Sequence, residues 1–122
     1  MRKEISSDHL TEVIVEGIQE VKGKDISIID MQTIDNAICD YFVLCSGDSH
    51  TQVESIARSI QKETRKSLQE KPWHTEGERN AEWVLLDYVN VVVHVFHKEN
   101  RSFYNLEELW ADAPIKEIPN IA

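Results

Sequence analysis

The sequence has few residues that break or cross-link a chain: 4 glycines, 3 prolines and 2 cysteines among 122 residues. The glycine-rich phosphate-binding patterns GxGxxG and GxxxxGKS/T are absent. Cys39 and Cys45 flank or lie in one predicted strand, where extended chain separates them by about 20 Å, beyond disulfide reach. We therefore expect reduced, packing cysteines in a single domain without repeats or low-complexity segments.

Long hydrophobic runs are also missing. No apolar segment approaches the roughly 18–20 residues that span a membrane. Basic residues at the N-terminus (1–8) are followed by no apolar segment, which argues against a signal peptide, and the early acids argue against a transit peptide. The expected location is the cytoplasm, with no membrane partner.

Basic charge is scarce, with 13 Lys and Arg against 22 Asp and Glu, a formal net charge of −9. This excess predicts little direct nucleic-acid binding, because phosphates must be neutralised by cations. Arg58, Lys62, Arg65 and Lys66 share one predicted helix with interleaved glutamates, which is typical of a solvated face. An acidic domain instead suits a basic partner.

Residues 83–97 are the most informative segment. Two apolar, β-branched runs are joined by Tyr88-Val89-Asn90, which predicts a β-hairpin with Asn90 in the turn. A hairpin this apolar must lie inside a sheet that helices cover.

Apolar spacing and capping signals predict the remaining elements. Gly23 is the expected C-terminal cap of the first helix. Ser49 and Gln52 form a capping-box pattern at the start of the second helix, which Pro72 ends. Ser102 is the expected N-cap of the third helix, which ends at Pro114. The predicted elements are a helix over 8–22, strands over 25–30 and 40–45, a helix from 49 to 72, an exposed loop over 73–79 apart from its Trp, the hairpin, and a helix from 102 to 114.

This order, α-β-β-α-β-β-α, predicts a single α/β (α+β) domain over residues 1–114 and a C-terminal tail over 115–122. A helix joins the second and third strands, so a crossover and a mixed sheet with packed helices are expected.

Catalytic and metal-binding patterns are weak. His94 and His97 are three residues apart on a strand, so they point to opposite faces and cannot easily share a metal ion. Asp40, Asp48 and Asp87 lie near strand ends, as enzyme carboxylates often do, but no nucleophile motif accompanies them. We expect no enzyme activity, no metal and no cofactor.

The large aromatic residues are more suggestive. Most should be core residues, and Trp110 above all, because it lies at helical spacing. Trp83 opens a strand and Tyr88 lies at the hairpin bend, so either could be an interface anchor or a core residue. The rings considered are Trp73, Trp83, Tyr88, Tyr104 and Trp110.

Four groups of residues form ordered signatures: DYFVLCSGDS (40–49) with Gln52-Val53, Glu76-Gly77 with WVLLDY (83–88), VVVHVFH (91–97), and FYNLEELW (103–110) with Ala113-Pro114. In this order they resemble the signatures of the ribosomal silencing factors, also called Iojap-like proteins. The departures are small: Asp48 replaces the common Asn or Thr, and Val89-Asn90 replaces the usual Gly-Asp at the turn.

The resemblance implies a translational repressor rather than an enzyme. Such a factor binds the large ribosomal subunit through ribosomal protein L-fourteen and sterically blocks association with the small subunit. The implied fold is nucleotidyltransferase-like, but the catalytic pattern of Gly-Ser and paired aspartates is absent, since Ser46-Gly47-Asp48 reverses the order. A nucleotidyltransferase-like enzyme or nucleotide-binding domain is the alternative.

Carried over by position, the docking aromatics of the family fall at Trp83 and Tyr88, and Asp87 could pair with a basic partner. Five residues apart on a straight strand, Trp83 and Tyr88 would point to opposite faces. They share a patch only if Tyr88 lies in the turn or the strand bends. An apolar docking surface left free could also support a homodimer.

Overall fold

The hairpin predicted from residues 83–97 lies inside a six-stranded mixed sheet in the computed structural model, which describes residues 5–121. Residues 1–4, part of the N-terminal segment used to argue against a signal peptide, lie outside the described residues. The elements are α1 (Ser7–Glu20), β1 (Lys24–Asp30), β2 (Tyr41–Gly47), α2 (His50–Leu68), β3 (His74–Glu76), β4 (Trp83–Asp87), β5 (Val91–His97), α3 (Lys98–Tyr104), α4 (Leu106–Leu109) and β6 (Ile115–Ile118).

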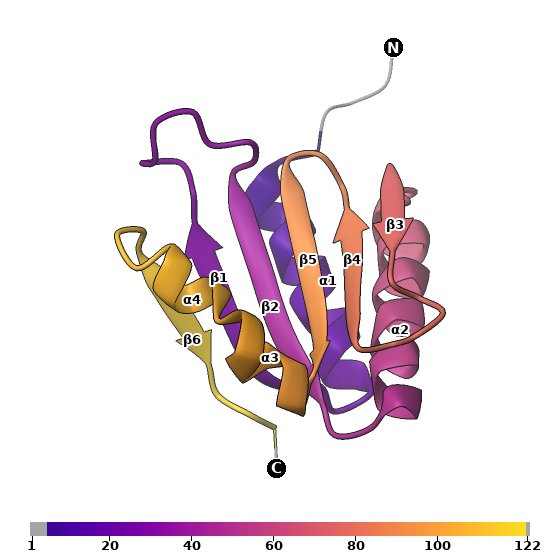
Figure 1. The fold of residues 1–122 in the computed structure, drawn as a ribbon. Helices are drawn as coiled ribbons and strands as arrows, with labels where there is room; N and C mark the ends of the chain where they lie inside the picture. The colour runs from indigo at the N-terminus through magenta and orange to yellow at the C-terminus, as the bar shows by residue number, and fades with distance from the viewer. Residues whose placement is uncertain (1–4, 122) are drawn as a thin grey trace.

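The strands are ordered β3-β4-β5-β2-β1-β6 across the sheet (Figure 1). β2 and β5 are paired in parallel, and the other neighbouring pairs of the described strands are antiparallel. The parallel pair requires a crossover, which includes α2, as expected from the helix between the second and third predicted strands. The prediction of a single α/β domain with a mixed sheet and packed helices is confirmed.

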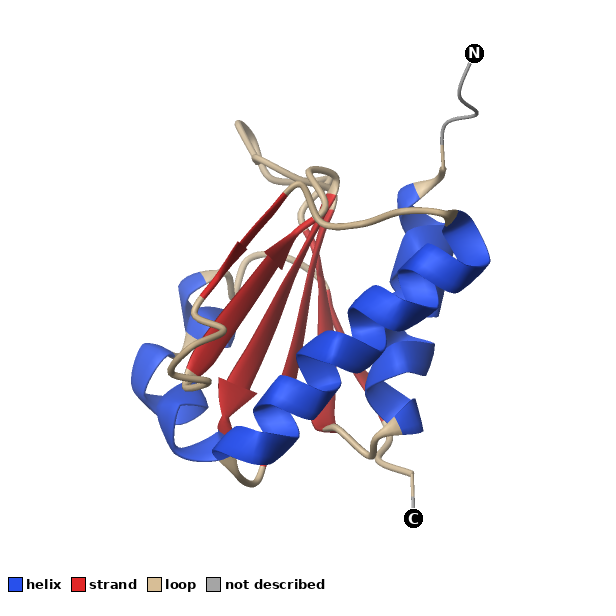
Figure 2. Cartoon of the chain, turned by 90° about the vertical axis from the view of Figure 1, so that its right-hand side faces the viewer, coloured by secondary structure: helices blue, strands red, loops and turns tan. Residues whose placement is uncertain are grey.

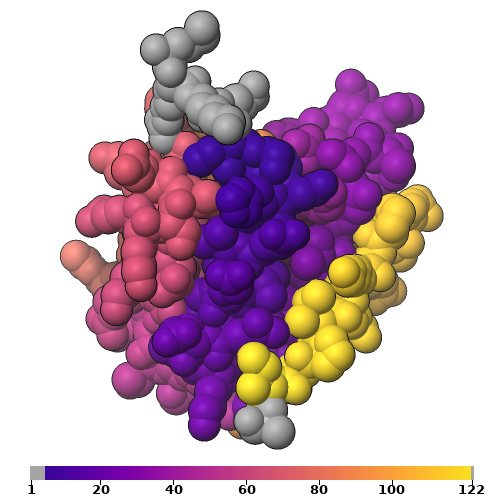
Figure 3. All heavy atoms as spheres, turned by 180° about the vertical axis from the view of Figure 1, so that it is seen from behind, coloured from indigo at the N-terminus to yellow at the C-terminus, as the bar shows by residue number. Residues whose placement is uncertain are grey.

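Helices cover both faces of the sheet unequally. α1 and α2 lie together on one face, and the shorter α3 and α4 lie on the other (Figure 2). Seen from behind, α1 and α2 cover the sheet and the C-terminal segment runs along its edge (Figure 3). Successive side chains of a strand point to opposite faces of the sheet, so the strands contribute to two cores. Val43, Val93 and Val95 face α1 and α2, while Phe42, Leu44 and Phe96 face the α3 side.

The α1–α2 contact is close because a glycine lies at the crossing. A Cβ atom at Gly17 would lie 2.9 Å from the Cα atom of Ile60. The Ser59 hydroxyl donates a hydrogen bond of 2.6 Å to the Gly17 carbonyl oxygen across the same contact. A larger residue at position 17 would force the two helices apart and open the main core.

The cap at the start of α2 is confirmed, but the one predicted at the end of α1 is not. The Ser49 hydroxyl accepts a hydrogen bond of 3.1 Å from the Gln52 amide. At the end of α1, Lys22 rather than Gly23 takes the left-handed conformation, with φ +60°. The Gly23 amide donates to the Ile18 carbonyl at 2.9 Å, which completes a Schellman motif. Gly23 is needed instead for space, because a Cβ there would lie 2.4 Å from the Ile18 side chain.

Three predictions about the C-terminal half are wrong in detail. The loop over 73–79 contains β3, which pairs with β4, and Trp73 is 82% exposed rather than packed. The helix expected from Ser102 begins at Lys98, capped by the His97 side chain, because the strand runs directly into the helix. Residues 115–118 of the expected tail form β6, an edge strand paired with β1. Short edge strands carry little hydrophobic periodicity, and the sequence pattern does not reveal them.

Candidate functional site: an aromatic patch beside α3

An exposed aromatic surface lies where the end of α3 meets the start of β4. Phe103 is 81% exposed and Tyr104 is 43% exposed, both at the end of α3. The Trp83 indole is half-buried, with its ring centroid 4.5 Å from that of Tyr104 and 5.1 Å from that of Phe96. We call Trp83, Phe103 and Tyr104, which cover the buried Phe96, the aromatic patch.

Sheet register explains why these rings meet. Trp83 pairs with Phe96 in the antiparallel β4–β5 ladder, so their side chains stand together on the α3 face. The chain leaves β5 at His97 and enters α3 at Lys98, which brings Tyr104 back over the same pair. Phe103 and Tyr104 contact each other edge to face, with centroids 5.2 Å apart. The patch therefore brings together β4 and the continuous β5–α3 segment.

Arg101 holds α3 in place below the patch. Its side chain is only 12% exposed and forms an ion pair of 3.2 Å with Glu107. The same guanidinium donates to the Ser46 and Ser27 hydroxyls at 2.9 and 3.1 Å, and also to the Asp25 carbonyl. Since α3 and α4 bury no residue fully, the largely covered Arg101 guanidinium is a main attachment of α3 to β1 and β2.

Gly77, in the loop after β3, lies directly against the backbone of Trp83. Gly77 has φ +81°, and a Cβ there would lie 2.0 Å from the Trp83 carbonyl oxygen. No L side chain fits that space, so Gly77 allows the loop after β3 to pass against the first residue of β4. Gly77 is thus a structural requirement for the position of Trp83.

The three residues predicted for partner binding do not form one patch. Trp83 lies in the aromatic patch, but Tyr88 is 7% exposed on the α2 side, where its hydroxyl is 2.8 Å from that of Thr64. Tyr88 lies at the bend, yet its ring enters the core. Asp87 shares the face of Trp83 at the far end of β4, and its carboxylate accepts a 2.7 Å hydrogen bond from the Val89 amide. Tyr88 therefore has a structural partner on α2, and Asp87 has one in the turn.

The conformation of the turn over Tyr88-Val89-Asn90 shows that replacing the usual Gly-Asp by Val89-Asn90 is not a neutral exchange. Val89 has φ +77°, and the Asn90 amide donates to the Tyr88 carbonyl at 3.0 Å. A hydrogen bond from residue i+2 to residue i around a positive φ marks a classic γ-turn, which is strained for a β-branched residue. The valine is 59% exposed, so core packing does not account for it.

Tyr104 and Phe103 are site residues that the sequence pattern does not predict. Tyr104 is one of the large rings, and both residues lie within the FYNLEELW segment. The available signal was a pair of adjacent aromatic residues near a helix end, which cannot both face the core. Trp110, expected in the core, is half-buried, with its ring centroid 6.0 Å from that of Phe42.

Two of the carboxylates near strand ends, Asp40 and Asp48, are kept apart by the fold. Asp40 and Asp48 flank opposite ends of β2. Asp40 accepts a hydrogen bond from Ser7, and Asp48 forms an exposed 2.8 Å ion pair with Lys24, which lowers the pKa of Asp48. Within residues 5–121, no three His, Cys, Asp or Glu side chains are grouped as metal ligands would be.

Two further features bear on nucleotide and thiol chemistry. A hollow of about 670 Å³ lies beside Arg101, but Asp25, Glu107 and Glu117 line it too. These acids disfavour a phosphate, and the Arg101 donors already have protein acceptors. Cys39 and Cys45 are both free and buried, and burial raises the pKa of the Cys45 thiol to about 12. Such a thiol is a packing group.

Comparison with known proteins assigns the family. Residues 4–122 match the family model described as "Ribosomal silencing factor during starvation". The chain is 46% identical over 98 residues to the ribosomal silencing factor of Bacillus subtilis, covering 80% of each protein. It is 38% identical to that of Halalkalibacterium halodurans, over 96% of this chain and 98% of the relative.

A crystal structure of a Chromobacterium violaceum protein superposes with a TM-score of 0.82 at 30% identity, covering 88% of both chains. No helix in the described part of the chain is long and apolar enough to cross a membrane. Sequence and structure comparisons thus agree with the motifs quoted from the hairpin and α3 segments. The chain belongs to the ribosomal silencing factor family, a family of regulatory, ribosome-associated proteins.

Proposed function

We propose that this protein binds the large ribosomal subunit through ribosomal protein L-fourteen and sterically blocks association with the small subunit. The observation that carries the proposal is the aromatic patch, in a protein whose relatives are named ribosomal silencing factors. Exposed aromatic residues beside a packed ring are the side chains that dominate protein–protein interfaces. Phe103 is 81% exposed, so packing in the core does not account for an aromatic residue at this position.

The charge around the patch suits a basic partner. Glu99 is exposed on α3, Glu82 is exposed directly before β4, and Glu108 is exposed on the neighbouring α4. Glu107 neutralises Arg101. The whole chain has a formal net charge of −9. An apolar centre with an acidic rim is the anatomy of an interface with a protein surface rich in Lys and Arg.

The proposed mechanism needs no chemistry. A body of 14.1 kDa docked on the joining face of one subunit occupies space that the other subunit requires. Only the position and the lifetime of the complex then determine how strongly subunit joining is reduced. Catalytic groups are unnecessary for this role.

Sedimentation with separated ribosomal subunits tests docking. Wild-type protein is expected to migrate with the large subunit, and Trp83→Ala and Phe103→Ala are expected to stay near the top of the gradient. Phe103→Ala is the sharper variant, because the 81% exposed ring can be removed without opening the core. Trp73→Ala is the matched control, since it removes a ring that is 82% exposed outside the patch.

Subunit joining, followed by light scattering, tests the consequence. Wild-type protein should slow formation of the complete ribosome, and Phe103→Ala should not. Wild-type protein that fails to migrate with large subunits would contradict the proposal itself. Binding that survives both patch variants but is lost in Trp73→Ala would move the docking surface to the other end of the molecule.

A homodimer of the free protein would use the same apolar patch. Two copies joined there would hide the surface that the ribosome needs, so dimerisation and docking would compete. Sedimentation equilibrium measures this directly. A dimer weakened by Phe103→Ala supports the shared surface, and a monomer at high concentration excludes competition.

A further inference from the structure

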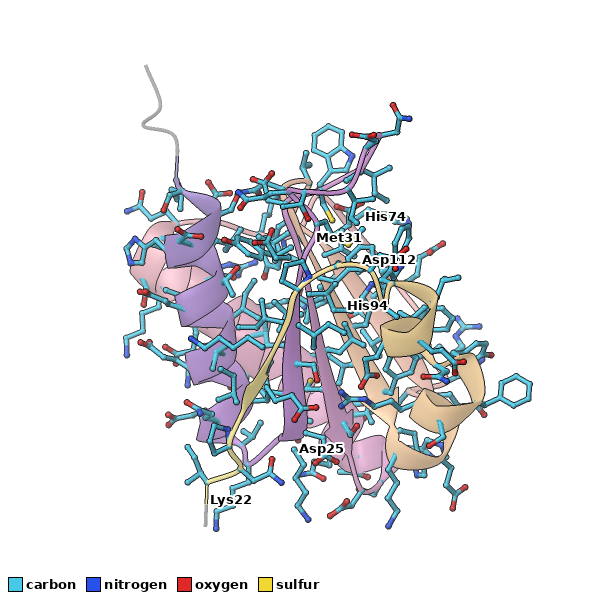
Figure 4. All side chains as sticks on the ribbon, turned by 90° about the vertical axis from the view of Figure 1, so that its left-hand side faces the viewer. Lys22, Asp25, Met31, His74, His94 and Asp112 are labelled. Atoms are coloured by element: carbon cyan, nitrogen blue, oxygen red, sulfur yellow. The ribbon has the colours of Figure 1, made fainter. Side chains whose placement is uncertain are left out.

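His94 is a buried histidine whose side chain has one hydrogen-bond partner among the described residues, and that partner is in the aromatic patch. The Trp83 indole N–H donates to the Nδ1 atom of His94 at 3.0 Å. His94 is 5% exposed and lies on the α3 side of β5, two residues before Phe96 (Figure 4). It pairs with Leu85 across the ladder, which places it diagonally opposite Trp83.

The direction of this hydrogen bond determines the state of the imidazole. An indole nitrogen can only donate, so the Nδ1 atom of His94 must carry no proton. Burial lowers the pKa of His94 to about 4, which keeps the ring neutral near pH 7. The single ring proton then lies on Nε2, which is buried and has no hydrogen-bond partner within residues 5–121.

That unpaired Nε2 argues against a simple packing role. Phe42 lies edge to face with His94, at a centroid distance of 5.0 Å and an interplanar angle of 86°, so the surroundings are aromatic. A phenylalanine at position 94 would fill an aromatic site without burying an unsatisfied N–H group. A histidine at this position is explained by its Nδ1 atom, which accepts the hydrogen bond from Trp83.

We propose that His94 is a positioning residue that holds the Trp83 indole in its docking orientation through the Nε1–Nδ1 hydrogen bond. The inference rests on the proposed docking function of the aromatic patch. Without that bond, stacking on Phe96 and Tyr104 restrains the ring but leaves its rotation in the stack free. The bond also occupies the only polar atom of the Trp83 side chain, so the indole ring presents an apolar surface to the partner.

Two substitutions separate the hydrogen bond from packing. His94→Phe keeps a ring of similar shape and removes the acceptor. His94→Asn removes the ring but keeps an acceptor oxygen close to the position of Nδ1. If His94 acts through the bond, His94→Phe should weaken binding to isolated large subunits by roughly fivefold to tenfold, and His94→Asn should bind more tightly than His94→Phe.

A second readout follows the bond itself. Exchange of the Trp83 indole proton with solvent, measured by NMR with Trp73→Phe and Trp110→Phe for assignment, should accelerate in His94→Phe and stay slow in His94→Asn. In a Trp83→Phe background, where the donor is already absent, His94→Phe should cause no further loss of binding. This double-mutant cycle remains informative if the asparagine variant is too unstable to measure.

The outcomes distinguish the two proposals. If Trp83→Ala and wild type bind large subunits equally, the docking assignment fails. If Trp83→Ala loses binding and His94→Phe binds like wild type, the positioning inference alone is overturned. Losses that add fully in the double variant would also overturn it, because His94 would then act independently of Trp83.

Discussion

Replacing His94 should change how the stability of the domain depends on pH. The imidazole has an ordinary pKa of 6.5, and burial lowers the pKa to about 4 in the folded protein, with no charged neighbour contributing to the shift. The unfolded chain therefore binds a proton more readily than the folded chain between these two values. This contribution to stability is fully present above pH 6.5 and is lost as the pH falls toward 4.

The expected size follows from the two pKa values. Between pH 7.5 and pH 5.0, proton binding by the unfolded state should remove about 2 kcal/mol of stability through His94 alone. His94→Phe has no proton to bind, so its free energy of unfolding should fall by about 2 kcal/mol less than that of wild type over the same interval. Carboxylate titration contributes to both proteins and cancels in the comparison.

Urea denaturation at the two pH values measures both free energies. His9→Gln is the matched control, because it removes an exposed histidine and should retain the wild-type difference. Equal losses of stability in wild type and His94→Phe would refute the reasoning, since they would mean that His94 titrates normally in the folded protein. A loss that is greater in His94→Phe would have the wrong sign.

Four further predictions concern the turn and the approach to the patch. Tyr88→Phe should destabilise the domain by about 1–2 kcal/mol, because it removes the buried bond to Thr64, and should leave ribosome binding unchanged in the sedimentation assay. Tyr88→Asp should prevent folding, seen by circular dichroism, because its carboxylate would be buried. Gly77→Ala should cost roughly 3 kcal/mol in urea denaturation and weaken docking, since its Cβ would collide with the Trp83 carbonyl. Val89→Gly should raise stability by about 1 kcal/mol, because relief of the left-handed valine (roughly 1–3 kcal/mol) exceeds the entropic cost of glycine (roughly 0.5–1 kcal/mol); an unchanged or lower melting temperature would contradict this.

The sequence predicted the elements that have strong periodic signals. Helix α1, the central strands and the β4–β5 hairpin follow from apolar spacing, and the start of α2 follows from Ser49 and Gln52. These signals are local, because each depends on residues within a few positions of one another. The short edge strands β3 and β6 were missed because a strand of three or four residues gains its order from a neighbour.

The candidate site could be predicted only in part. Trp83 was selected from its place at the start of an apolar strand, and the structure places it in the aromatic patch. Tyr88 is predicted as a second docking residue, but its ring lies in the core, where its hydroxyl is hydrogen-bonded to Thr64. The next residue, Val89, has a φ of +77°. Whether an aromatic residue at a bend faces solvent or core depends on the packed helix, which no local pattern encodes.

Composition and motifs by themselves determined the family, the mixed α/β class, and the absence of recognisable phosphate-loop and nucleophile patterns. Which rings meet depends on contacts that form only when the chain has folded. The register that sets Trp83 opposite Phe96, the path of α3 that returns Tyr104, and the hydrogen bond to His94 all join residues distant in the chain. Such contacts form because both faces of the sheet are buried, which fixes the register of each strand and the face to which each side chain points. A shift of the register by one residue would turn every side chain to the opposite face.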